Sequence, residues 1–205
     1  RTARGSASRP HAEARAEAMA DAQGFTMVPP FDHPWIIAGQ GTVGMEVAQD
    51  WPEVDTVLAP MGGGGLSSGA AVALKALLPE ARFVGVEPRG AASMTAALKA
   101  GGPVTISHVE TIADGLRTNR AGALTFLHAR ALFDEVVQVE DSDILEATSR
   151  LFNQRKLVVE PSGAATLAAV IAGSVSVEGR RVAVILSGGN LDPSLIPSLA
   201  SGEVP

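Results

Sequence analysis

Apolar residues in this chain gather in short runs, and longer alanine-rich or charged segments separate them. Short apolar runs bounded by turn residues are typical of strands that are buried on both faces. These runs predict strands at residues 54–60, 82–87, 135–139, 157–160 and 181–186. Arg181 to Leu186 is the most continuously apolar of them, and we expect it to be a fully buried strand.

The segments between these runs have the composition of helices and turns. Alanine- and leucine-rich stretches predict helices at residues 11–23, 43–49, 67–78, 91–100, 121–133, 143–156 and 162–172. Three prolines exclude a helix at Val28–Pro34, and Gly39–Thr42 predicts a turn. Asp143, with Glu146 three residues later, resembles a capping box. Strands alternating with helices predict an α/β fold, a parallel twisted sheet with helices on both faces.

Four consecutive glycines, Gly62 to Gly65, follow the first predicted strand and precede a helix. They leave the backbone N–H groups uncovered, and the start of the helix adds free N–H groups and the positive end of its dipole. One or two glycines are enough for a tight turn, so four favour a phosphate cradle. The loop of nucleoside-triphosphate enzymes needs a lysine here, whereas this chain has Leu66. The loop therefore fits a single phosphate monoester.

Composition argues against several classes of partner. The 205 residues carry a net charge of −6, which argues against nucleic acid or an anionic membrane as the main partner. Aromatic residues make up only 4% of the chain and tyrosine is absent, so base-stacking platforms are not expected. No apolar run approaches the length of a membrane span. The absence of cysteine fits a cytoplasmic location.

Six short motifs follow one another along the chain: Ile37–Thr42, Gly62–Leu66, Gly85–Pro88, Thr111–Leu116, Lys156–Pro161 and Ser187–Asn190. Together they resemble the threonine/serine dehydratase and serine racemase family of fold-type II pyridoxal-phosphate enzymes. The resemblance runs from about Arg9 to about Asp192. It implies that residues 1–27 are the tail of a small domain. Residues 28–205 would be a large cofactor-binding domain whose N-terminal part is missing.

The resemblance implies pyridoxal 5′-phosphate as cofactor and assigns residues to its two ends. Gly62, Gly63, Gly64, Gly65 and Leu66 would bind the phosphate through backbone N–H groups. Ser187, followed by Gly188, would offer its hydroxyl to the ring nitrogen. A hydroxyl does not keep that nitrogen protonated, so less charge enters the ring and a β-hydroxyl is expelled more readily. The implied reaction is β-elimination of water from L-threonine or L-serine, giving a 2-oxo acid and ammonia.

Two further positions are assigned on the same basis, and each has an alternative. Gly115, after Asp114, would line the edge of the cofactor ring, but the pair also fits a plain Asp-Gly turn. Glu160, before Pro161, would support the residues that touch the cofactor. The alternative for Glu160 is a residue that ends a strand and caps the next helix.

Members of this family often hold a divalent cation beside the carboxylate that corresponds to Glu87. The carbonyl oxygen of Ala91 and the side chain two positions further on would complete the site, and that side chain is Ser93. A hydroxyl is a weak, neutral ligand for Mg²⁺ or Ca²⁺, which prefer carboxylate oxygens and water. The site would therefore depend on water. The alternative is that Glu87 is a solvated strand end.

The family's chemistry requires a lysine that forms a Schiff base with the cofactor, in a Ser-Phe-Lys-like motif that this chain does not contain. Its three lysines, Lys75, Lys99 and Lys156, do not correspond to that position. We therefore expect a C-terminal portion of the enzyme that is inactive alone, because covalent catalysis fails without the lysine. When complete, the enzyme is expected to take a small amino-acid substrate and to form a homo-oligomer.

Other functions stay open from the sequence. A serine or aspartate racemase, or a hydroxyaspartate dehydratase, would use the same fold and motifs. A noncatalytic cofactor-binding module or a split subunit would need no lysine of its own. A nucleotide-binding domain would have an acidic residue about twenty positions after its glycine loop, and Glu87 lies near there.

Overall fold

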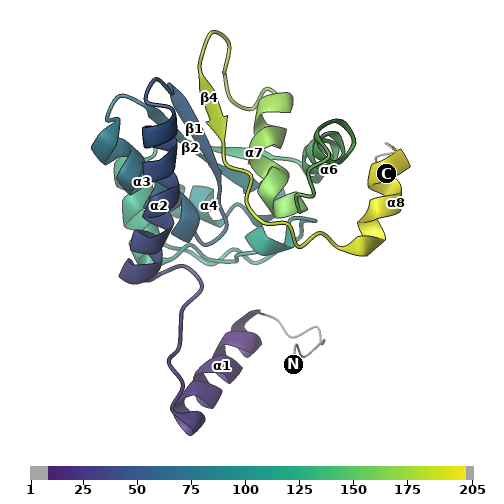
Figure 1. Ribbon diagram of the computed structural model, residues 1–205. Helices are drawn as coiled ribbons and strands as arrows, with labels where there is room; N and C mark the ends of the chain where they lie inside the picture. The colour runs from purple at the N-terminus through teal and green to yellow at the C-terminus, as the bar shows by residue number, and fades with distance from the viewer. Residues whose placement is uncertain (1–8, 202–205) are drawn as a thin grey trace.

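The computed structural model describes residues 9–201, and its centre is a parallel sheet (Figure 1). The strands are β1 (Thr56–Pro60), β2 (Arg82–Pro88), β3 (Glu135–Val139) and β4 (Val182–Val184). They lie in the order β3-β2-β1-β4. Thr56 pairs with both Arg82 and Val182, and Val84 pairs with Glu135. The predicted parallel sheet is confirmed.

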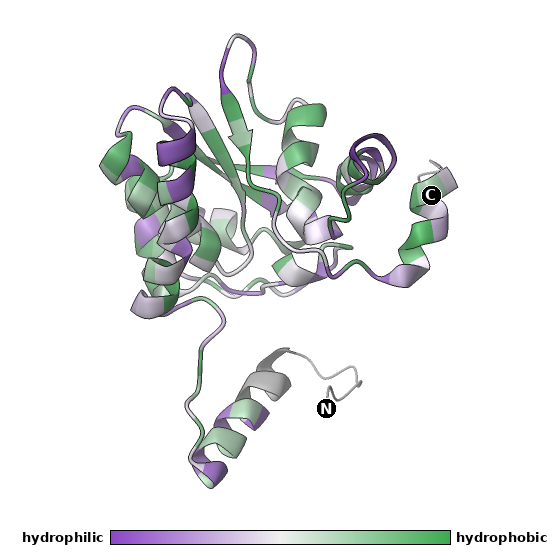
Figure 2. Cartoon of the chain, in the orientation of Figure 1, coloured by the Kyte–Doolittle hydropathy of each residue, from purple (hydrophilic) through white to green (hydrophobic). Residues whose placement is uncertain are grey.

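Helices cover both faces of the sheet. They are α2 (Pro34–Asp50), α3 (Gly65–Leu77), α6 (Asp141–Arg150) and α7 (Pro161–Ile171). Side chains alternate across a strand, so Val57 and Ala59 pack toward α2 and α3, whereas Leu58 packs toward α6 and α7. Figure 1 shows the two helix pairs on opposite sides of the strands, and the strands are mostly hydrophobic in Figure 2.

A third group of buried residues lies beyond the carboxyl end of β1, where Met61 packs with α4 (Ser93–Ala100) and α5 (Ala123–Leu132). The remaining elements are 3₁₀ turns at Arg89–Ala91, Asp114–Leu116 and Pro193–Leu195, a π-helical segment at Leu151–Arg155, α8 (Ile196–Ser201) and α1 (Arg9–Gln23). Figure 1 shows α1 apart from the sheet and its helices, joined to α2 by an extended segment. Among residues 9–201, no helix is both long and apolar enough to cross a membrane.

The turn predicted at Gly39–Thr42 is wrong, because α2 runs through it without a break. The glycines of α2 and α3 serve close helix packing instead. A Cβ atom at Gly44 would overlap the carbonyl oxygen of Ala70, and one at Gly69 would overlap the carbonyl oxygen of Ile37. These glycines therefore let the backbones of α2 and α3 approach each other.

Two strand predictions also need correction. Residues 157–160 form no strand and follow Lys156, whose φ of 59° is left-handed and turns the chain out of the π-helical segment. The last strand is shorter than predicted and only half-buried. Within the described sheet β4 pairs with β1 alone, so its other edge meets no strand.

The capping box of α6 lies three residues earlier than predicted. The Glu140 side chain accepts from the backbone at Asp143, and the Asp143 side chain accepts from the backbone N–H of Glu140. Glu146 instead forms an ion pair with Arg150 one turn further along the helix. The sequence analysis therefore placed the capping box about one helical turn too far along the chain, at Asp143 and Glu146 instead of Glu140 and Asp143.

Candidate functional site

A cavity of about 210 Å³ opens beyond the carboxyl ends of β1 and β4. It is lined by eight of the nine positions predicted to bind the cofactor: Gly62, Gly63, Gly64, Gly65, Leu66, Gly115, Glu160 and Ser187. The ninth, Gly188, lies against the Glu160 carboxylate. The ends of parallel strands are where α/β sheets bind their ligands. The structure thus gathers residues from segments more than 120 positions apart in the sequence at one place.

The glycine loop runs from the end of β1 into the first turn of α3. Gly64 has a φ of 94°, a left-handed conformation that favours glycine, and a Cβ atom there would lie 2.9 Å from the Thr125 Cβ. Within residues 9–201, the backbone N–H groups of Gly62 to Leu66 meet no protein acceptor. The loop therefore offers free donors, without side chains at its four glycines, at the start of a helix. That arrangement fits a phosphate group.

Besides Pro30, Pro60 and Leu116, two further residues that the sequence analysis did not select line the cavity. The ring of Phe31 lies against the loop, since a Cβ at Gly63 would overlap it and one at Gly65 would lie 2.9 Å from the Phe31 Cβ. Ser162, in the first turn of α7, is the other. A lone aromatic in a proline-rich loop and a serine in a helix start give no local signal for a binding site.

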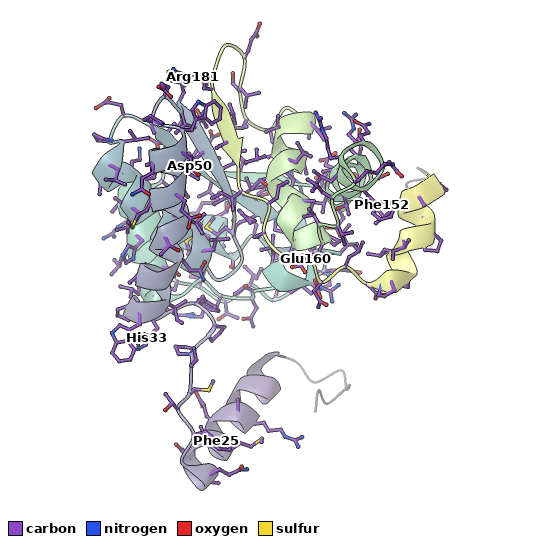
Figure 3. The ribbon with its side chains drawn as sticks, viewed as in Figure 1. Phe25, His33, Asp50, Phe152, Glu160 and Arg181 are labelled. Atoms are coloured by element: carbon purple, nitrogen blue, oxygen red, sulfur yellow. The ribbon has the colours of Figure 1, made fainter. Side chains whose placement is uncertain are left out.

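The turn after β4 carries Ser187 and Gly188 and is fastened to Glu160. The Glu160 N–H donates to the Gly188 carbonyl oxygen at 3.2 Å, and the Asn190 N–H donates to Glu160 Oε2 at 2.9 Å. Gly188 has a φ of 84°, and a Cβ there would overlap the Glu160 carboxylate. Figure 3 shows Glu160 at the end of α7 that faces this turn. Glu160 therefore both begins α7 and supports the turn that carries Ser187.

Gly115 joins the cavity from the 3₁₀ turn at Asp114–Leu116. Its N–H donates to Ser162 Oγ at 2.9 Å and also to the Asp114 side chain at 2.9 Å. The turn is thus an Asp-Gly turn that is tied to the first residues of α7 and faces the cavity. A Cβ at Gly115 would lie 2.9 Å from Ser162 Oγ, so a larger residue would push the two segments apart.

Glu87 is fully buried, so its interpretation as a solvated strand end is wrong. Its Oε1 accepts from the Met94 N–H at 2.7 Å, and its Oε2 accepts from the Thr95 N–H and hydroxyl at 2.9 and 2.7 Å. Burial raises the pKa of Glu87 to about 6, although these hydrogen bonds oppose the shift. The carboxylate caps the start of α4, and the Ser93 hydroxyl beside it is buried without a partner in the described chain.

The lysines lie away from the cavity. Lys75 Nζ forms an ion pair with Asp134 at 2.8 Å, near the amino end of the sheet, where Asp134 also accepts from the Phe83 N–H. Lys156 Nζ donates to the carbonyl oxygen of Asn153 at 2.7 Å. Lys99 stands in the last turn of α4. None of the three contributes to the cavity lining.

Comparison with known proteins identifies the family to which this chain belongs. The family model for "Pyridoxal-phosphate dependent enzyme" matches residues 3–188, and the chain belongs to this family. The predicted family and fold class are confirmed.

Several of its relatives are named as threonine dehydratases or ammonia-lyases. A putative threonine dehydratase of Sinorhizobium fredii is 40% identical over 195 residues, which are 94% of this chain and 59% of the relative. An L-threonine ammonia-lyase of Thermotoga maritima is 41% identical over 173 residues, which are 84% of this chain and 43% of the relative. The chain therefore spans about half the length of these two relatives.

Solved structures agree with this assignment. A threonine deaminase from T.th. superposes with a TM-score of 0.82 at 40% identity, covering 88% of this chain and 62% of that one. Maize serine racemase superposes with a TM-score of 0.86 at 37% identity, covering 95% of this chain and 61% of that one. The same fold therefore occurs in proteins named for threonine deamination and for serine racemisation.

Proposed function

We propose that this protein binds pyridoxal 5′-phosphate and acts as an ammonia-lyase on L-threonine or L-serine, forming a 2-oxo acid and ammonia. The proposal rests mainly on one observation: the glycine loop, Gly115, Glu160 and Ser187 line the same cavity. Support also comes from relatives named as a putative threonine dehydratase and an L-threonine ammonia-lyase, at 40% and 41% identity. The cofactor, when bound, supplies an electron-withdrawing ring that makes the Cα proton of an amino acid acidic.

In this proposal the two ends of the cavity hold the two ends of the cofactor. The free N–H groups of Gly62 to Leu66 bind the phosphate dianion, helped by the dipole of α3. The Ser187 hydroxyl makes a hydrogen bond to the ring nitrogen, and Glu160 keeps the turn of Ser187 in place. Gly115 lines the ring edge and leaves room for it because it has no side chain.

A neutral hydroxyl at the ring nitrogen has a chemical consequence. A carboxylate there would keep the nitrogen protonated and draw the Cα charge fully into the ring. Ser187 carries no such charge, so with the cofactor bound more electron density would stay at Cα, next to the carbon that bears the β-hydroxyl group. Loss of that hydroxyl group would then be favoured over reactions that depend on full delocalisation of charge into the ring.

We propose that the reactive lysine which the family's chemistry requires lies in chain that these 205 residues do not include. Support comes from the positions of Lys75, Lys99 and Lys156, since none of them lines the cavity. Lys75 is already paired with Asp134. The residues described here would then supply the phosphate and ring-nitrogen contacts, and the remaining chain would supply the lysine.

Further proposals concern the context of the site. Residues 28–205 would be the large domain and residues 1–27 the tail of a small one, with residues 1–8 and 202–205 outside the described part.

A Mg²⁺ or Ca²⁺ ion beside Glu87 would bind the Ala91 carbonyl oxygen and, through water, the unpartnered Ser93 hydroxyl. We also propose a cytoplasmic homo-oligomer, in line with the biosynthetic enzymes among its relatives.

The experiment that tests the function uses the protein at the full length that its gene encodes, loaded with pyridoxal 5′-phosphate. We expect L-threonine to give ammonia and 2-oxobutanoate in equal amounts, with L-serine giving pyruvate. D-Threonine is the control substrate and should give neither product. Absence of any 2-oxo acid from both L-amino acids would contradict the proposal.

A racemase is the second candidate, because maize serine racemase matches 95% of this chain. A racemase returns a proton to the opposite face of Cα and keeps the β-hydroxyl. Chiral analysis of the L-serine reaction separates the two functions. D-Serine without pyruvate would favour the racemase, whereas pyruvate without D-serine would favour the lyase.

A further inference from the structure

One peptide of the glycine loop is held from outside the cavity. The Thr125 hydroxyl donates a hydrogen bond of 2.7 Å to the carbonyl oxygen of Gly63. Thr125 is completely buried and does not line the cavity. In a trans peptide the C=O and the following N–H point in opposite directions. The bond to the Gly63 carbonyl therefore turns the N–H of Gly64 away from Thr125, toward the side where Gly64 lines the cavity.

The neighbouring peptide is fixed in a similar way. The carbonyl oxygen of Gly64 accepts from the Ser68 N–H at 2.9 Å and from the Ser67 hydroxyl at 3.3 Å, inside the first turn of α3. The N–H of Gly65 consequently points away from α3. Two successive peptides are thus oriented by bonds to their carbonyl groups. Such bonds also polarise the N–H of the same peptide and make it a better donor.

Thr125 is itself held by a distant carboxylate. Asp32 accepts hydrogen bonds of 2.9, 2.9 and 3.1 Å from the N–H groups of Ala123, Leu124 and Thr125, which are the first residues of α5. The residue before this helix is Gly122, which has no side chain to cap it, and a Cβ there would overlap Asp32. Asp32, about 90 positions upstream, therefore caps the N-terminus of α5, and its negative charge lies at the positive end of that helix's dipole.

Aromatic packing completes the support of the loop. Phe31, next to Asp32, lies against Gly63 and Gly65, while Thr125 lies against Gly64. The segment Phe31–Asp32 thus contacts the loop directly through its ring and indirectly through α5. No functional residue was expected here, because this part of the chain was predicted only as a proline-rich loop.

We infer that Thr125, held in place by Asp32, is a positioning residue that aims the Gly64 N–H at the phosphate of the cofactor. The inference rests on the proposed binding of pyridoxal 5′-phosphate at this loop. It goes beyond that proposal by making phosphate affinity depend on a side chain that touches neither the cofactor nor the cavity.

The test compares two ligands that differ only in the phosphate. Dissociation constants for pyridoxal 5′-phosphate and for pyridoxal are measured by equilibrium dialysis on the protein at its full encoded length. Thr125→Val keeps the shape of the side chain and removes the hydroxyl, whereas Thr125→Ser keeps the hydroxyl. Thr42→Val is the matched control, because the exposed Thr42 hydroxyl also donates to a backbone carbonyl, that of Gly39, at 2.9 Å.

We expect Thr125→Val to weaken the binding of pyridoxal 5′-phosphate between about twofold and tenfold, the usual range for one neutral hydrogen bond. Binding of pyridoxal should not change. Thr125→Ser and Thr42→Val should keep the wild-type ratio of the two constants. An unchanged ratio in Thr125→Val would overturn the inference, and so would an equal loss for both ligands, which would indicate a general structural role.

Two additions keep the result decisive. If Thr125→Val does not fold, Thr125→Ala removes the same hydroxyl without placing a methyl group against the Gly63 carbonyl, and the same ratio decides. A wild-type protein that binds both ligands equally would overturn the proposed phosphate site and the inference with it. A wild-type preference for the phosphate that survives in Thr125→Val and Thr125→Ala would overturn the inference alone.

Discussion

At the scale of single residues, the cavity depends on positions where no side chain fits. Gly64 has a left-handed backbone and faces Thr125, and Gly188 has a left-handed backbone and faces Glu160. These two glycines lie at opposite ends of the proposed cofactor site, one in the phosphate loop and one in the Ser187 turn. At both ends the missing side chain allows a neighbour to hold the backbone in place.

The first prediction concerns Gly64→Asp. The substitution places a carboxylate near the proposed phosphate position and a Cβ 2.9 Å from the Thr125 Cβ, so cofactor retention should fall sharply. Absorbance of the bound cofactor after gel filtration measures it. Gly101→Asp is the control, since Gly101 is also left-handed at φ 76° but has open space around it, and it should keep the cofactor. Full cofactor absorbance in Gly64→Asp would place the phosphate elsewhere.

The second prediction concerns Ser187→Ala. Removal of one neutral hydrogen bond to the ring nitrogen should weaken cofactor binding by about tenfold or less and slow the elimination. Fluorescence titration with pyridoxal 5′-phosphate and the rate of 2-oxo acid release measure the two effects. Ser142→Ala, at an exposed position of α6, should change neither. Wild-type affinity and rate in Ser187→Ala would mean that the hydroxyl does not reach the ring.

At the scale of elements, the packing of α2 on α3 is set by glycines. The third prediction is that Gly44→Ala lowers the free energy of unfolding by about 1–3 kcal/mol, because its methyl group would overlap the Ala70 carbonyl oxygen. Gly39→Ala in the same helix meets nothing within 4 Å. That variant should be neutral or slightly more stable, since alanine favours helices. Urea unfolding compares them, and equal effects of the two substitutions would contradict the close packing.

The fourth prediction concerns the ion pair that ties β4 to the segment before β1. Arg181 donates to Asp55 from its backbone N–H and its guanidinium group, with a shortest distance of 2.8 Å, and this holds the pKa of Asp55 at about 2. Figure 3 shows Arg181 at the end of the molecule away from Glu160. A depressed carboxyl pKa gives stability that is present above the unfolded pKa and is lost as the pH falls from about 4 toward 2.

Asp55→Asn should therefore lower the urea midpoint at pH 7 and lower it less at about pH 3. The exposed pair Arg150 and Glu146 on α6 is the matched control, and Glu146→Gln should have a smaller effect at pH 7. If Asp55→Asn lowered the urea midpoint by the same amount at both values of pH, the charge of Asp55 would contribute nothing to stability.

The elements show what the sequence could predict. Arg82–Pro88 and Glu135–Val139 were predicted within one residue, because short apolar runs bounded by charged or turn residues are local signals. Gly39–Thr42 was predicted as a turn because glycine favours both turns and close helix contacts, and the partner helix is not visible from local sequence. The partial exposure of β4 depends on its place at the edge of the sheet, which is a property of the assembled fold.

The same distinction applies to the site. Gly62–Leu66 and Ser187 line the cavity, and their place at one site could be predicted because both lie in contiguous motifs that follow strands. The roles of Phe31 and Thr125 could not be predicted, because their contacts with the loop join segments that are about 30 and 60 positions apart. The burial of Glu87 was also missed, since it comes from the start of α4 folding back over the end of β2.

At the scale of the whole molecule, the sheet places the cavity at one end and the structural ion pairs of Lys75 and Arg181 at the other. The edge strand β4 is half-buried, and α1 lies apart from the sheet and its helices (Figure 1). The chain also spans about half the length of the relatives described above. These observations support the proposal made above that residues 28–205 are a large cofactor domain that works together with further chain.

The most direct measurement is a crystal structure of the protein at its full encoded length with pyridoxal 5′-phosphate. We expect the phosphate within hydrogen-bond distance of the N–H groups of Gly62 to Leu66, the ring nitrogen at the Ser187 hydroxyl, and no bond from the cofactor to Lys75, Lys99 or Lys156. A phosphate bound away from the glycine loop, or a covalent link to one of these three lysines, would contradict the account.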